Sequence, residues 1–141
     1  MLRRALLAVV LALTAGSALA AAKPEKDKGD VGQYVDLQPV GLPIVAKGQL
    51  VNYVFVYVRL NLTSAANAAR LREREPFFRD ALVRAGHRTP FTLASDYTKI
   101  DGPRLVAALT REAAAIAGPG QIRSVVLTSQ APRRRMSQPR T

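Results

Sequence analysis

The sequence has 141 residues, about the length of one domain. Basic residues outnumber acidic ones by 21 to 10, the formal net charge is +11, and hydrophobic residues make up 48% of the chain. This hydrophobic content excludes a wholly disordered protein. The chain has no cysteine and one histidine, His87, which excludes disulfides, thiol catalysis and metal sites built from several histidines. The composition therefore predicts a small basic domain without a cofactor.

The first twenty residues have the pattern of a secretory signal peptide. Arg3 and Arg4 precede an apolar stretch, and the small residues Ala18 and Ala20 mark a cleavage site after position 20. A retained anchor is the alternative, although residues 5–22 as a helix would span only about 27 Å. The paired arginines leave Sec and twin-arginine export both open. Either way, we expect the remaining chain in the periplasm, free or anchored in the inner membrane.

Polar segments flank the expected folded domain, residues 34–130. Residues 21–33 mix charges with proline and glycine, which is typical of a solvated tether. Residues 131–141 contain almost nothing apolar to bury and are predicted to form a disordered basic tail. In an exported protein, such a tail favours anionic envelope surfaces over nucleic acid. The candidate residues for contact with an anionic surface are Arg133, Arg134, Arg135 and Arg140.

Residues 52–62 give the strongest strand signal, because aliphatic and other side chains alternate strictly along them. Their aliphatic face is expected to be core. Their aromatic face needs a cover, which either another element of the chain or a protein partner would provide. Before this strand, proline interrupts the short apolar runs 34–37 and 42–45, which predicts edge strands or an extended arm, followed by a turn at Lys47 and Gly48.

A helix is expected next, with Ser64 as the candidate N-cap, a start near Ala65 and an end near Gly86. Pro76 predicts a kink or break within it. Its arginines and glutamates form either a solvated face or a face that docks a partner. His87 then begins a polar, turn-rich segment and is expected to be an exposed loop residue.

The second helix is predicted to begin at Gly102 and Pro103, with Asp101 as a candidate cap, and to end before Gly118. Residues 121–129 follow as a strand. Strands and helices do not alternate regularly, so we expect an α+β fold, an antiparallel sheet with a long central strand that two helices back on one face.

The order of these segments resembles the periplasmic domain of the FliL family of flagellar basal-body-associated proteins. The matching features are residues 34–37, the long strand 53–62, the stretch EPFFRDAL at residues 75–82, the helix from Gly102 and the strand 122–128. The resemblance implies a stomatin-like domain without enzyme activity that forms homo-oligomeric rings beside the stator of the flagellar motor and supports motility. The family usually keeps a transmembrane helix where this chain has a cleavable-looking leader.

Aromatic and arginine side chains would carry contacts to other copies or to a stator or basal-body partner, since these types dominate interface energies. The candidate interface residues are Tyr53, Phe55, Tyr57, Arg72, Arg74 and Arg79. The alternative function is an exported envelope-binding protein of the same fold, without a flagellar role, held on anionic surfaces by its tail. An enzyme is disfavoured, because no nucleophile elbow, phosphate loop or metal-ligand cluster is present and the nearest acidic group is Asp96, Asp101 and Glu112.

Overall fold

The architecture is built on β3 (Gln49–Leu62), a strand of 14 residues in the computed structural model, which describes residues 32–135. Branched aliphatic residues alternate with aromatic ones along this strand, so its two faces differ in chemistry. The side chains of one face are all buried in the core: Val54, Val56, Val58, Leu60 and Leu62.

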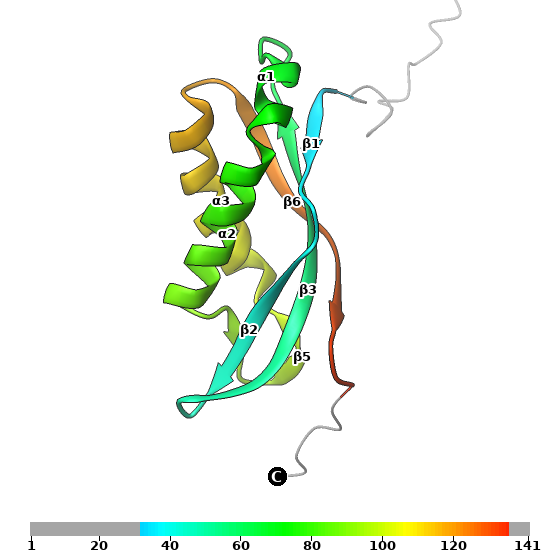
Figure 1. The fold of residues 1–141 in the computed structure, drawn as a ribbon, viewed down its shortest axis with the longest axis vertical. Coiled ribbons are helices and arrows are strands. Elements are labelled where there is room, and N and C mark those ends of the chain that lie inside the picture. Colours follow the sequence, from blue (N-terminus) through cyan, green and yellow to red (C-terminus); the bar gives the residue numbers. More distant parts are fainter. Residues whose placement is uncertain (1–31, 136–141) are drawn as a thin grey trace, which may run out of the picture.

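Two short strands share one edge of β3, and a long strand occupies the other edge (Figure 1). β1 (Tyr34–Asp36) pairs with the C-terminal part of β3, and β2 (Val40–Ala46) pairs with its N-terminal part. β6 (Ile122–Pro132) follows the opposite edge over most of the length of β3. All three pairings are antiparallel, and the sheet is three strands wide where β6 faces β1 or β2 across β3, whereas the N-terminal residues of β3 pair with β2 alone.

The turn between β2 and β3 is formed by Lys47 and Gly48, as predicted. Both residues have positive φ, 52° and 73°, which is the backbone of a two-residue hairpin whose twist matches that of the strands. Glycine adopts this conformation without strain, whereas lysine seldom does.

Helices cover only the aliphatic face of the sheet (Figure 1). The short α1 (Ala68–Glu73) leads directly into α2 (Glu75–Arg88), and α3 (Gly102–Ala117) lies beside α2. A small hairpin of β4 (Thr92–Leu93) and β5 (Asp96–Ile100) connects α2 to α3.

The core lies between the helices and the sheet. Phe78 and Leu82 of α2 and Leu105 and Leu109 of α3 are fully buried there, and each contributes about 1.5–3 kcal/mol relative to an exposed side chain. Gly86 lets α2 approach β2 closely, because a Cβ added at this position would lie 2.8 Å from Cδ2 of Leu42.

The predicted α+β architecture is confirmed, with its antiparallel sheet and long central strand, and the described residues contain three helices where two were expected, because the first is divided into α1 and α2. The break near Pro76 is also confirmed, since this residue lies in the first turn of α2, where its missing N–H costs little. Asp101 caps α3 as expected, accepting a hydrogen bond from the amide of Arg104. The first cap was predicted wrongly. Asn67, not Ser64, accepts from the amide of Arg70, so α1 starts at residue 68.

The structure also differs from the sequence-based prediction in the segment 87–100 and at both boundaries of the domain. The polar segment 87–100 contains the β4–β5 hairpin, and His87 belongs to the last turn of α2, where it is exposed. β6 includes Ala131 and Pro132, so the first part of the expected tail is strand. Gln33 is also ordered, since its carbonyl accepts a hydrogen bond from the amide of Leu62. Ala18, Ala20 and Arg140 lie outside the described residues.

Candidate functional site

The face of the sheet opposite the helices has no covering element among residues 32–135 (Figure 1). We call this surface the open face. Its central side chains project from β3 between the buried valines, and its margins come from the strands on either side. Phe55 and Tyr57 are 42% and 43% exposed, and Val126 of β6 is 41% exposed. The open face consists of Tyr34, Asp36, Gly41, Tyr53, Phe55, Tyr57, Arg59, Asn61 and Val126.

Phe55 is held in place by the strand beside it. It lies directly opposite Gly41 in the register of β2 and β3. A Cβ added to Gly41 would lie 3.3 Å from the Phe55 ring, so the ring packs on the bare backbone of β2. One side of the Phe55 ring therefore packs on the backbone at Gly41, while 42% of the residue remains exposed to solvent.

An ion pair shapes the upper part of the open face. Nε and Nη2 of Arg59 donate to the two carboxylate oxygens of Asp36, at 2.7 and 3.0 Å. The hydrogen bonds to Asp36 raise the pKa of Arg59 above its ordinary value. The guanidinium carbon also lies 3.9 Å from the centre of the Tyr34 ring. Because the pair is exposed, it adds little stability, but its fork geometry fixes the guanidinium plane.

A shallow pocket of about 290 Å³ opens beside this ion pair. Tyr57 and Thr128 form part of its wall, and Thr128 Oγ1 donates to the Tyr57 carbonyl at 3.0 Å. The open face thus combines fixed aromatic rings, a neutralised charge pair and a hollow. Aromatic and arginine side chains are the types that carry most of the energy in protein interfaces.

The predicted interface residues fall on two sides of the molecule. Arg72 lies at the β1 margin of the open face, because its Nε donates to the Tyr34 carbonyl at 3.1 Å. Arg74 belongs to the helix layer, where Nη1 donates to the carbonyl of Ile116 at 3.3 Å. Arg79 pairs with Glu75 on α2, also in the helix layer. The structure therefore gathers Tyr53, Phe55 and Tyr57 with Arg72, and separates them from Arg74 and Arg79.

Six residues of the open face were not among the predicted interface residues: Tyr34, Asp36, Gly41, Arg59, Asn61 and Val126. Strand alternation already assigned Arg59 to the aromatic side, and its fork to Asp36 needed only the pairing of β1 with β3. Val126 and Gly41 carry no signal in the sequence, because their places depend on the strand order and register.

A smaller apolar patch lies on the helix layer. Phe77 of α2 is 63% exposed. It lines a pocket of about 370 Å³ with Arg74, Arg84 and Ile116. This patch has one aromatic ring, whereas the open face has several.

The acidic residues are engaged separately. Asp96 accepts hydrogen bonds from the hydroxyl and amide of Thr98, which lower its pKa, and Glu112 pairs with Arg88 at 3.7 Å. Within the described part of the chain, no three His, Asp or Glu residues are grouped to hold a metal ion. None of the helices between residues 32 and 135 is long and apolar enough to cross a membrane.

A scan of the sequence against known protein families gives no match. A search of curated proteins gives none either.

Proposed function

We propose that this chain is a non-enzymatic accessory protein that acts by docking its open face onto protein, as a FliL-like component beside the stator of the flagellar motor. The observation that carries the binding role is the exposed pair Phe55 and Tyr57 at the centre of the sheet. Large apolar side chains clustered on the surface of a small domain mark an interaction site. The motor itself is proposed from the order of the strand and helix segments, which resembles the FliL family.

Copies of the chain are the first partner expected at this face, and a stator or basal-body protein is the second. The fork between Arg59 and Asp36 leaves the open face near neutrality, so a second open face would meet it without strong repulsion. The contact would gain from burying the rings of Tyr53, Phe55 and Tyr57.

The test compares two changes of the same kind on opposite sides of the domain. Phe55→Ser with Tyr57→Ser removes the rings of the open face, and Phe77→Ser removes the exposed ring of the helix layer. Because all three rings are at least 42% exposed, each variant is expected to remain folded, and the open-face variant should be the less stable one because it loses the packing of Phe55 on β2. The open-face variant should lose self-association in analytical ultracentrifugation, and the Phe77 variant should keep it.

In a motile host, the gene carrying the open-face changes should spread on soft agar as poorly as a clean deletion. The Phe77→Ser gene should restore spreading. Full spreading by the deletion strain would rule out the motor role. Self-association that is unchanged by the open-face changes would rule out the proposed surface.

A further inference from the structure

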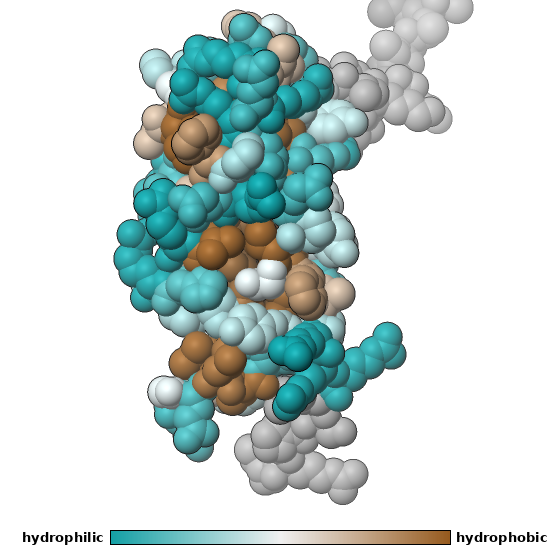
Figure 2. All heavy atoms as spheres, viewed as in Figure 1, coloured by the Kyte–Doolittle hydropathy of each residue, from teal (hydrophilic) through white to brown (hydrophobic). Residues whose placement is uncertain are grey.

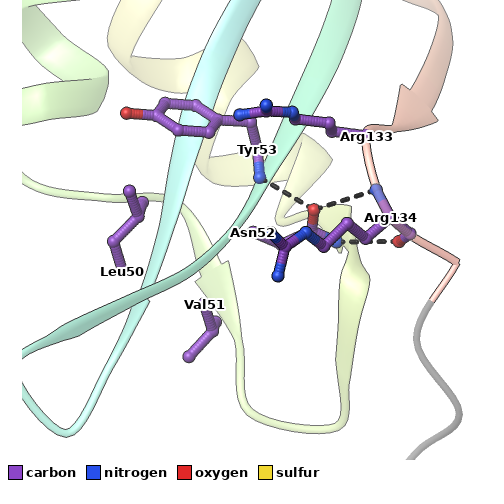
Figure 3. Close-up of a pocket in the computed structure, with 6 residues that line it drawn as sticks. All are labelled: Leu50, Val51, Asn52, Tyr53, Arg133 and Arg134. Atoms are coloured by element: carbon purple, nitrogen blue, oxygen red, sulfur yellow. Dashed lines mark hydrogen bonds between the residues drawn. The ribbon is translucent and has the colours of Figure 1, made fainter.

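One end of the molecule collects basic side chains around an exposed leucine. Leu50, at the start of β3, is 54% exposed. Lys47 forms the adjacent turn, and the chain after β6 brings arginines to the same end (Figure 3). In Figure 2 a hydrophobic patch lies near this lower end, beside strongly hydrophilic residues. We call this end the basic pole, and it consists of Lys47, Leu50, Arg133, Arg134 and Arg135.

Asn52 fixes the arginines to the sheet (Figure 3). It is 4% exposed, and its Oδ1 accepts from the amides of Tyr53 and Arg134 at 2.9 and 3.2 Å. Its Nδ2 donates to the carbonyls of Arg134 and Tyr97, both at 3.0 Å. The amide of Arg133 also donates to the Tyr53 carbonyl at 2.8 Å. The backbone at residues 133 and 134 is thus clamped, while the side chains remain available.

The positive charge of the basic pole is not neutralised by the rest of the described chain. Four ion pairs within residues 32–135 involve other arginines, namely Arg59, Arg79, Arg84 and Arg88. The carboxylate on β5, Asp96, is engaged by Thr98, and Lys99 on the same strand balances its charge. Arg133 and Arg134 line the same pocket as Leu50, with Lys47 in the adjacent turn and Arg135 next along the chain. None of these four cations has a carboxylate partner among the described residues.

We propose that the basic pole docks onto a bilayer surface rich in anionic phospholipid. Guanidinium groups bind phosphate oxygens in pairs, and a protruding aliphatic side chain can enter the acyl boundary below the headgroups. A single-stranded nucleic acid would instead call for aromatic side chains on which bases stack. The proposal does not depend on the role of the open face, although the two surfaces meet at Tyr53.

The N-terminal end of the domain lies opposite the basic pole. Gln33 is held there, donating from Nε2 to the Ala66 carbonyl at 3.1 Å. Chain preceding Gln33 therefore joins the domain at the end of β3 remote from Asn52. Docking through the basic pole leaves the N-terminal end pointing away from the bound surface.

The experiment is co-sedimentation of the full chain with phosphatidylcholine vesicles that contain or lack phosphatidylglycerol, at low and high salt. The readout is the gain caused by phosphatidylglycerol, because any apolar anchoring outside the domain acts on both vesicles. Arg133→Gln with Arg134→Gln should weaken this gain roughly 25-fold, since each basic residue contributes about fivefold at an anionic surface. Glutamine keeps the backbone that Asn52 clamps.

A matched control removes the same charge elsewhere. Arg70→Gln with Arg111→Gln takes two exposed arginines from α1 and α3 and should change the gain less than about threefold, because the Debye length of about 10 Å at 0.1 M salt screens distant charges. Leu50→Ser should weaken binding severalfold at both salt concentrations, whereas the effect of the arginines at positions 133 and 134 should shrink at high salt.

Three results would overturn the proposal. The first is equal binding to both vesicle types. The second is equal weakening by the two arginine pairs, which would indicate net charge rather than a built surface. The third is sensitivity to the arginines with none to Leu50, which would indicate a soluble polyanion or an acidic protein as the partner. Self-association through the open face is measured in a separate experiment, so none of these results would contradict it.

Discussion

Asn52→Ala tests how strongly a single buried amide ties the end of β6 to the domain. The substitution removes four hydrogen bonds from a residue that is 4% exposed. Each hydrogen bond contributes about 0.5–1.5 kcal/mol net to the free energy of unfolding. The expected loss of stability is about 2–4 kcal/mol, which is the lower part of the range for four bonds, because water can replace some of the lost partners. A small pocket of about 100 Å³ beside Asn52 gives such water access. For a domain of this size, this loss corresponds to about 10–25 °C in melting temperature.

Thermal unfolding followed by circular dichroism measures the loss, with Asn61→Ala as the control. Asn61 lies on the same strand and its Nδ2 donates one hydrogen bond, to Ser124 Oγ at 3.0 Å, so its loss should stay near 1 kcal/mol. Trypsin should also cleave at Arg133 and Arg134 roughly tenfold to a hundredfold faster in the Asn52 variant, because local opening becomes easier. Equal melting temperatures for the two variants would refute the clamp.

Three further changes probe the rest of the domain. Gly86→Ala should destabilise the domain by up to about 2 kcal/mol, measured by urea unfolding. The added methyl group costs about 1–3 kcal/mol in overpacking against Leu42, which outweighs the gain of about 1 kcal/mol in helix propensity. A variant more stable than the wild type would contradict the close packing. Asp96→Asn should lower stability at neutral pH only. The hydrogen bonds from Thr98 depress the pKa of Asp96, so its contribution is present above about pH 4 and fades as acid protonates it; a wild-type advantage that persists at pH 2 would exclude this cause. Asp36→Asn should scarcely move the melting temperature but should loosen the Arg59 side chain, which nuclear magnetic resonance relaxation of its Nε–H detects; an unchanged order parameter would contradict the fork.

The elements with strong periodic signals were predictable from the sequence. The alternation along β3 determined its buried face, and Asp101, Pro103 and Gly118 marked both ends of α3. Pro76 indicated where the first helical segment divides, because proline is tolerated in a first turn and not in an interior.

The features that could not be predicted from the sequence depend on tertiary contacts. Ser64 and Asn67 are both good caps by residue type, and only the course of the chain after β3 selects Asn67. The strand character of Ala131 and Pro132 comes from pairing with β3, since neither residue favours a strand by itself.

The candidate surfaces were likewise predictable in their residue types but not in their tertiary arrangement. The stripe of Tyr53, Phe55 and Tyr57 was visible in the sequence, but its lack of a cover was not, because that depends on both helices packing on the other face. Arg133 and Arg134 were identified as basic, whereas the role of Asn52 in holding them required residues 82 positions apart in sequence to meet.

The described chain enters the domain at one end and leaves it at the opposite end. This arrangement determines how the domain responds to mechanical tension. β1 and β6 both lie antiparallel to β3, so tension between residues 32 and 135 pulls along the strand axes. The ladder hydrogen bonds run across that direction and would be loaded in shear, many at a time, instead of being opened one by one. Such geometry suits a rigid spacer that transmits force between two anchored structures.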